Sequence, residues 1–239
     1  MDKSSLGHHI SQQFNAELED IRNRVLLMGG LVEKQIGDAV NSLVNADVEL
    51  AQSVMTNDYR VNGMEVALDE ECAHILARRQ PAASDLRLIV AVIKTITDLE
   101  RIGDQAEKVA RMGMQLAEME RPKTQYQEIQ ALGDQARQIL HDALDAFARM
   151  DVEAALEVAH RDVVVDRAYE GIMRQMITFM MEDPRSIARS LNIMWAARAL
   201  ERIGDHSRNI CEYVIYLVRG KDVRHISLEQ MEKEAREAL

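Results

Sequence analysis

The sequence predicts an all-α fold, a tandem repeat of two three-helix bundles with six long helices in total. The first indication is composition, because the 239 residues include only 3 prolines and 11 glycines, although 47% of them are hydrophobic. Few helix-breaking residues, with 14 methionines and only 4% aromatic residues, are typical of long amphipathic helices rather than of sheets. The second indication is an internal repeat, since the hexapeptide LERIGD occurs at Leu99–Asp104 and again at Leu200–Asp205.

The repeat extends beyond this hexapeptide. The segment DVELAQSV from Asp47 aligns with DVEAALEV from Asp151, at an offset of 104 positions that falls to 101 at LERIGD. MGGLVEKQIGDAVNSL aligns with ALGDQARQILHDALDAF at the same offset of 104, with Gly29 matching Gly133. We therefore predict two halves of common ancestry, residues 1–121 and residues 122–223, followed by a charged C-terminal tail, residues 224–239.

Three helices are expected in the first half. A long helix covers about residues 5–44, and a second begins at Asp47, a natural N-cap residue, and ends before Pro81. A third covers about residues 84–118, and Pro122 marks the joint between the halves.

The second half repeats this order. Its helices are expected to begin near Thr124, at the cap Asp151, and at Asp183, which forms the favoured N-cap and N1 pair with Pro184. The last long helix ends near Gly220, and SLEQMEKEAREAL is expected to form a short charged tail helix. Short connections make successive long helices antiparallel, so each half becomes an up-down-up bundle.

Charge and targeting signals narrow the functional class. With 29 basic and 40 acidic residues the net charge is -11, which makes nucleic acid an unsuitable partner. The N-terminal segment lacks the apolar core of a signal peptide, and no long uncharged apolar stretch occurs, so we expect a cytoplasmic protein. Cys72 and Cys211 are isolated within helical patterns and are expected to be small buried hydrophobes.

The repeated hexapeptide places two carboxylates four residues apart and a glycine beside the second. Like charges at this spacing repel by a few tenths of a kcal/mol, and an interior glycine costs roughly 1 kcal/mol. At 100° per residue, the carboxylates lie opposite a seam of core residues and are expected to face outward. In the first half the seam consists of Leu99, Ile102, Ala106, Val109 and Leu116. In the second half it consists of Leu200, Ile203, Ser207, Ile210, Val214 and Leu217.

Two explanations of these carboxylates remain open. One is a solvated helix face, balanced by neighbouring cations such as Lys108 beside Asp104. The other is a metal site, because Gly103 and Gly204 would clear space for an ion, a ligand or another backbone. Hard oxygen ligands of this kind suit Mg²⁺, Mn²⁺, Ca²⁺ or iron.

A second acidic pair lies on the second helix of the second half. Asp162 and Asp166 are four residues apart there, and Asp58 and Asn62 stand at the matching places in the first half. Neighbouring antiparallel helices would bring each pair close to the repeated carboxylates, which makes a shared metal site an expectation.

Two segments of the chain resemble a known family. RRQPAASDLRLIVAVIKTITDLERIGDQAEKVAR and ALERIGDHSRNICEYVIYLVRG are similar to the signature segments of the PhoU family of bacterial phosphate-signalling regulators. The resemblance runs from ELEDIRNRVLLMGGLVE through Gly220 and implies a six-helix tandem bundle without catalytic activity. It also implies a negative regulator of the phosphate-starvation (Pho) regulon, whose partners are a sensor histidine kinase and the ATPase subunit of the high-affinity phosphate ABC importer.

The resemblance implies metal binding as well. E/D-x-x-x-D motifs of this family bind metal clusters on the outer face of the bundle, which implies Mg, Mn, Fe or Zn as the cofactor. The first half carries Lys108 where the second has Asn209, so we expect weaker metal binding in the first half. The metal ligands expected here are Glu100, Asp104, Glu201, Asp205 and Asn209, with Asp58, Asp162 and Asp166 from the second helices.

Partner contacts are expected at two places. The start of the third helix in the first half, QPAASDLR, offers Asp85 and Arg87 as partner-binding residues, whereas the second half has DPRSIARS and no such pair. Hydrophobic residues of the first helix, such as Met28 and Leu31, are expected to be exposed and to permit a homodimer.

One enzymatic alternative exists. Glu71 with His74 and Glu157 with His160 fit the E-x-x-H pattern of di-iron carboxylate proteins, which would make the chain an oxidase or an iron store. The two pairs do not correspond under the repeat, which argues against this alternative. No glycine-rich phosphate loop or nucleophile motif occurs, and His206 is expected to be an ordinary polar residue on a helix surface.

Overall fold

The computed structural model describes residues 3–120 and 126–236, and its regular secondary structure there is entirely helical. The first half contains α1 (Lys3–Asn45), α2 (Val48–Asn57), α3 (Tyr59–Arg79) and α4 (Ala83–Ala117). The second half contains α5 (Gln127–Arg149), α6 (Val152–Glu182), a 3₁₀ turn (Pro184–Ser186) and α7 (Ile187–Arg219), and the tail contains α8 (Leu228–Arg236). The all-α prediction is confirmed.

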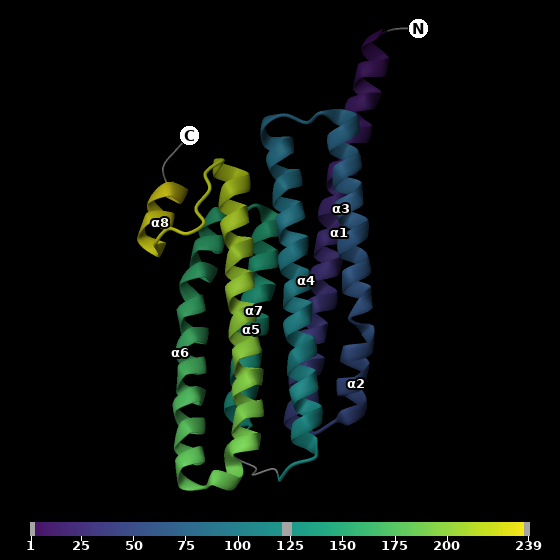
Figure 1. The fold of residues 1–239 in the computed structure, drawn as a ribbon. Helices are drawn as coiled ribbons and strands as arrows, with labels where there is room; N and C mark the ends of the chain where they lie inside the picture. Colours follow the sequence, from purple (N-terminus) through teal and green to yellow (C-terminus); the bar gives the residue numbers. More distant parts are fainter. Residues whose placement is uncertain (1–2, 121–125, 237–239) are drawn as a thin grey trace.

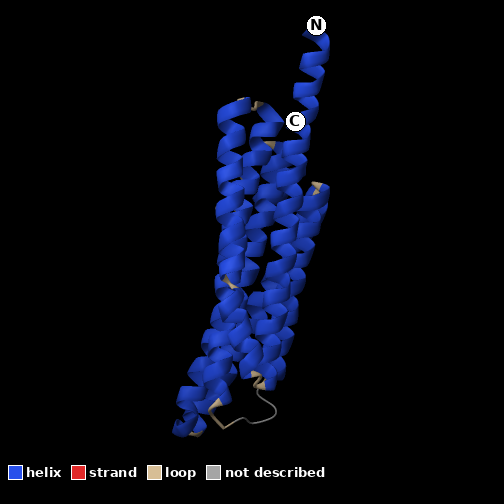
Figure 2. Cartoon of the chain, turned by 90° about the vertical axis from the view of Figure 1, so that its right-hand side faces the viewer, coloured by secondary structure: helices blue, strands red, loops and turns tan. Residues whose placement is uncertain are grey.

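The long helices form two three-helix bundles side by side. α4 and α7 run antiparallel at the centre, with α1 and α5 behind them (Figure 1). α2 and α3 pack on α1 and α4, while α6 packs on α5 and α7. The view turned by 90° shows an elongated bundle, with the N-terminal turns of α1 projecting from one end (Figure 2). The tandem-bundle prediction is confirmed, and the two halves meet mainly through α4 and α7.

The second helix of the first half differs from its prediction. It is divided at Asp58, which ends α2 and precedes α3 while keeping right-handed helical angles, φ -59° and ψ -33°. The carboxylate of Asp58 turns inward and accepts a hydrogen bond from Gln35 Nε2 at 2.8 Å. The sequence pattern predicted one continuous helix because it did not reveal that this side chain is buried.

Most helix ends agree with the sequence. Three aspartates accept backbone N–H hydrogen bonds at the starts of helical segments, as their positions predict: Asp47, Asp151 and Asp183. Gly220 ends α7 with φ +73°, a left-handed conformation that glycine adopts without a steric cost. The expected joint at Pro122 and helix start at Thr124 lie outside the described residues.

One hydrophobic core extends through both halves, because α1, α4, α5 and α7 all contribute to it. The predicted seam residues are buried in it, and Cys72 and Cys211 are buried free thiols, as expected. The prediction that Met28 and Leu31 are exposed for a dimer contact is wrong, since Met28 is completely buried and Leu31 packs against the core. Leu27, next to them on α1, is 67% exposed.

The tail is packed rather than free. Met231 and Ala235 of α8 are buried in a second, smaller cluster with residues of α6 and α7. His160 Nε2 lies 2.7 Å from Glu232 Oε1, which ties α6 to α8 at the surface. Among the described residues, no helix combines the length and apolar character that a membrane crossing requires.

Candidate functional site

The repeated carboxylates lie between helices and not on a free outer face. Glu100 and Asp104 of α4 are half-buried beside α2 and α3. Asp205 of α7 is half-buried beside α6, and Glu201 is only 8% exposed. They point away from the core seam as predicted, but the second helix of each half covers that side. Their direction is therefore as expected, but three of them are partly covered and Glu201 is buried.

The glycine of each hexapeptide makes room for a carboxylate on the neighbouring helix. A Cβ atom on Gly103 would lie 3.3 Å from Asp58 Oδ1. A Cβ atom on Gly204 would lie 2.7 Å from Asp162 Oδ1, closer than van der Waals contact allows. The missing side chains thus let the second helix of each half place an aspartate against the third.

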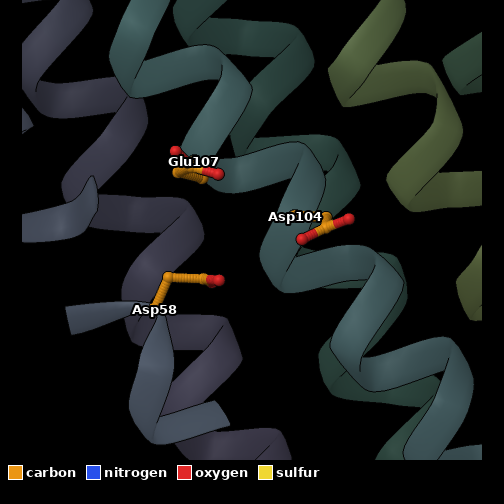
Figure 3. Close-up of side chains that lie close together, drawn as sticks. All are labelled: Asp58, Asp104 and Glu107. Carbon is orange, nitrogen blue, oxygen red and sulfur yellow. The ribbon is translucent and has the colours of Figure 1, made fainter. Parts of the chain in front are cut away.

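In the first half, three carboxylates converge. Asp58, Asp104 and Glu107 each contribute one oxygen to a group in which all three atoms lie within 4.8 Å of one another (Figure 3). Asp58 is buried, whereas the two α4 residues are half-buried. Burial, and then the nearby Asp58, raise the pKa of Asp104, while burial and Asp104 raise the pKa of Glu100. The site therefore carries excess negative charge that a cation would neutralise.

Gln35 of α1 supports this arrangement. Its Nε2 donates to Asp58 Oδ1 and fixes that carboxylate, as does Asn62 Nδ2 at 3.3 Å from Asp58 Oδ2. The other amide atom, Gln35 Oε1, is buried and has no hydrogen-bond partner among the described residues. A buried acceptor beside three carboxylates fits the all-oxygen coordination of Mg²⁺ or Mn²⁺.

Glu107 was not identified from the sequence. It lies outside the repeated hexapeptide, and its counterpart at the offset of 101 is Arg208, so the repeat hid it. One signal could have found it, because positions i and i+3 share a helix face and Glu107 follows Asp104 by three. Arg111 Nη2 pairs with Glu107 Oε1 at 2.5 Å and holds the side chain in place.

The second half neutralises its own acidic group. Asp162 is 2% exposed, and burial, followed by the charge of Asp166, raises its pKa to about 6. Arg208 Nη1 lies 3.4 Å from Asp162 Oδ2. Glu201, with a pKa raised to about 7 by burial and by Asp205, pairs with Arg198.

The two halves therefore differ in how much negative charge is available to bind a cation. Arg208 stands where the first half has Glu107, so a guanidinium replaces a carboxylate at the same place in the repeat. In the described part of the second half, no three carboxylate oxygens gather as they do around Asp58. The geometry favours the first half as the stronger cation site, the reverse of the order expected from Lys108 and Asn209.

Asn209 serves a different contact. Its Nδ2 donates to Asp98 Oδ1 across the α4/α7 interface at 3.2 Å, so its side chain faces away from the acidic group. His206 Nδ1 lies 2.7 Å from the same oxygen, and Tyr213 donates its hydroxyl to Asp98 Oδ2 at 2.7 Å. His206 is only 6% exposed, which corrects its expected surface position. This network joins the two halves.

Of the expected partner-binding pair, Arg87 makes a contact within the fold. Arg87 Nε donates to the backbone oxygen of Leu217 at 3.2 Å, and its side chain packs against Gly220. Arg87 therefore caps the C-terminal end of α7, where a cation is favoured by the helix dipole. Asp85 lies half-buried in the first turn of α4.

The E-x-x-H pairs do not form a di-iron site. Glu71 accepts from Arg24 Nη1 at 2.5 Å, and His160 pairs with Glu232. The two pairs lie in different halves, and Glu71 and His160 are engaged in separate contacts with Arg24 and Glu232, so the oxidase alternative is not supported.

Comparisons with known proteins agree with this architecture. The family model described as the PhoU domain matches residues 25–112 and 129–214. The phosphate-specific transport system accessory protein PhoU homolog of Pseudomonas aeruginosa is 59% identical over 234 residues, 98% of this chain and 97% of the relative. The crystal structure of PhoU from Pseudomonas aeruginosa has a TM-score of 0.84 at 59% identity, and covers 87% of this chain and 100% of its own.

A more distant structure shows the same fold. The phosphate transport system regulatory protein PhoU from Streptococcus pneumoniae has a TM-score of 0.81 at 30% identity, over 88% of this chain and 99% of its own. Both halves of the chain match the family model, and the similarity to the Pseudomonas aeruginosa relative is nearly complete in length. The chain therefore belongs to the PhoU family.

Proposed function

We propose that this chain is an accessory regulator of phosphate-specific transport. It acts as a negative regulator of the Pho regulon, couples the high-affinity phosphate ABC importer to the sensor histidine kinase, and modulates phosphate uptake. One observation carries this proposal: 59% identity, over 98% of this chain, to a phosphate-specific transport system accessory protein.

The proposed mode of action is binding without catalysis, in the cytoplasm. The partners are the sensor histidine kinase and the ATPase subunit of the importer. We also propose a homodimer. The exposed Leu27 on α1 is its proposed contact residue, in place of Met28 and Leu31. The name of the relative, an accessory protein, supports a regulatory role.

Complementation tests the proposal directly. The gene would be expressed in a Pseudomonas aeruginosa strain that lacks its own PhoU homolog, and alkaline phosphatase would be measured in phosphate-rich medium. We expect this chain to restore repression, whereas Ile102→Asp, which charges a fully buried position, should fail as a folding control. Full phosphatase activity in the presence of folded wild-type chain would contradict the regulatory role.

We further propose that Asp58, Asp104 and Glu107 bind a divalent cation. The donor set is entirely oxygen, which favours Mg²⁺, Mn²⁺ or iron over Zn²⁺. Asp58 lies at the junction of α2 and α3, and the other two residues lie on α4, so a bound ion would hold the junction against α4 (Figure 3).

A further inference from the structure

An exposed apolar stripe runs along the first turns of α7. Ile187, Leu191 and Trp195 are 43%, 42% and 63% exposed. They follow one another at intervals of four residues and therefore share one face of the helix. Trp195 is the only tryptophan of the chain. Adjacent large apolar side chains that the protein leaves uncovered are typical of interaction surfaces.

Trp195 forms one wall of a groove between α4 and α7. The groove has a volume of about 290 Å³ and is lined by Asn192 and Trp195 of α7 and by Lys108, Met112 and Gln115 of α4. It can accept a large apolar side chain, because Trp195 and Met112 provide apolar walls.

The groove continues into a cationic surface. Arg101 precedes Lys108 by seven residues on α4, and Arg202 follows Trp195 by seven residues on α7. Because the two helices are antiparallel, both steps run in the same direction, by about 10 Å, and keep the same helix face. Arg101, Lys108 and Arg202 are exposed, and none of them lies within ion-pair distance of a carboxylate of the described residues. Arg101 and Lys108 act electrostatically on Glu100 and Asp104 of the same helix.

The repeat provides an internal comparison. Under the offset of 101, Trp195 corresponds to Lys94, Met112 to Tyr213 and Gln115 to Tyr216. At this second location Lys94 Nζ lies 5.5 Å and 5.3 Å from the ring centres of the two tyrosines. At this location the cation and the two aromatic rings are therefore already engaged with one another by cation–π contacts. At the Trp195 location, Lys108 lines the same groove as the ring, and no cation–π contact to Trp195 occurs among the described residues.

We propose that the α4/α7 groove binds an acidic segment of a partner protein. An apolar side chain of that segment lies beside Trp195, and its carboxylates pair with Arg101 and Arg202. The distance between the apolar and cationic parts matches two turns of a helical segment. An anionic membrane surface is disfavoured as the binding partner. The chain carries a net charge of -11, so the membrane would repel the rest of the protein surface. The inference is independent of the phosphate-regulon and metal proposals.

Trp195 itself reports binding, since its fluorescence shifts to shorter wavelength when water is excluded. Three helical, tryptophan-free peptides would be titrated into the chain, each with one leucine anchor and two glutamates placed one, two or three turns away. We expect a saturable blue shift, strongest for the two-turn peptide and weaker at high salt. Peptides with lysine in place of glutamate should not bind.

Charge-reversal variants test the cationic residues. Arg101→Glu with Arg202→Glu should weaken peptide binding by about tenfold or more. Arg60→Glu with Arg167→Glu changes the net charge equally at exposed positions elsewhere and should leave binding intact. Circular dichroism and melting temperature establish that both double variants are folded.

Four results would overturn the proposal. They are no shift with any glutamate peptide, equal binding of lysine peptides, equal losses in both double variants, and a shift produced by phosphatidylglycerol vesicles but by none of the peptides. Analytical ultracentrifugation adds a fifth, because a wild-type dimer that Trp195→Ala converts to a monomer would assign the groove to a second copy of the chain.

Discussion

Gly204 lies so close to Asp162 that a Cβ atom on the glycine would come within 2.7 Å of the aspartate's Oδ1. This contact explains why the repeated hexapeptide carries a glycine inside a helix. The cost of roughly 1 kcal/mol in helix propensity is offset by the close approach of α6, which glycine alone permits. Gly103 has the same relation to Asp58, but with a looser contact of 3.3 Å.

The two glycines should therefore respond differently to alanine. Gly204→Ala gains helix propensity but forces the buried Asp162 carboxylate to move, so we expect a net loss of about 1 kcal/mol in unfolding free energy. Gly103→Ala should change stability by less than that, because its neighbours need to shift by only a few tenths of an ångström. Urea unfolding in EDTA measures both, and equal effects would contradict the close-approach explanation.

Glu212 should make the stability of the metal-free protein depend on pH. Burial raises its pKa to about 7, partly opposed by Arg208, so the folded chain holds a proton that the unfolded chain releases near pH 4.5. Its stabilising contribution is complete below that pH and is lost as the pH rises toward 7. The slope reaches at most about 1.4 kcal/mol per pH unit.

Glu212→Gln stays neutral and should flatten the pH dependence between pH 5 and 8. Part of the slope should remain, because Glu201 and Asp162 have raised pKa values of the same sign. Glu229→Gln, at an exposed position of α8, is the matched control and should leave the slope unchanged. An identical slope in wild type and Glu212→Gln would exclude this carboxyl group as a source.

Asp98 should be the most sensitive polar residue of the α4/α7 interface. Asp98→Ala leaves His206, Asn209 and Tyr213 without their acceptor in a buried place, so we expect a loss of about 3 kcal/mol or more. Asp98→Asn keeps one acceptor oxygen and should lose less. Chemical denaturation followed by circular dichroism compares them, and two equally mild variants would show that the network contributes little.

Arg87 should act on the end of α7 rather than on a partner. Arg87→Ala removes the hydrogen bond to the Leu217 carbonyl and should cost about 1 kcal/mol, with faster amide exchange in the last turn of α7. Asp85→Ala should leave exchange in that turn unchanged. Wild-type exchange in Arg87→Ala, combined with lost kinase binding, would return Arg87 to a partner surface.

Helix periodicity and the internal repeat were sufficient to predict the architecture. The caps Asp47 and Asp151 and the terminating Gly220 were visible because capping depends on local sequence. The break at Asp58 was not, and the buried carboxylate there bonds to Gln35, 23 positions earlier in the chain, a contact that local sequence does not reveal. Local pattern thus gives the elements, and long-range polar contacts alter them.

The candidate sites were predicted only in part. The repeat identified carboxylates that do lie close to Asp58 or Asp162, but an identical motif gives no information on what covers it. Glu107 was missed because comparison of the halves emphasised what they share, and that comparison did not show that Arg208 lies beside Asp162. The groove was hidden because its lining residues come from α4 and α7, which lie in different halves of the sequence and meet only when the halves pack.

We propose that the first half holds a cation at Asp58, Asp104 and Glu107, and that Arg208 takes the place of such a ligand in the second half. Titration with Mn²⁺, followed by the electron paramagnetic resonance signal of the free ion, measures this most directly. Wild type should bind Mn²⁺, Glu107→Gln should bind it about tenfold or more weakly, and Arg208→Glu should gain a second site. Binding that is the same in all three proteins would contradict the claim.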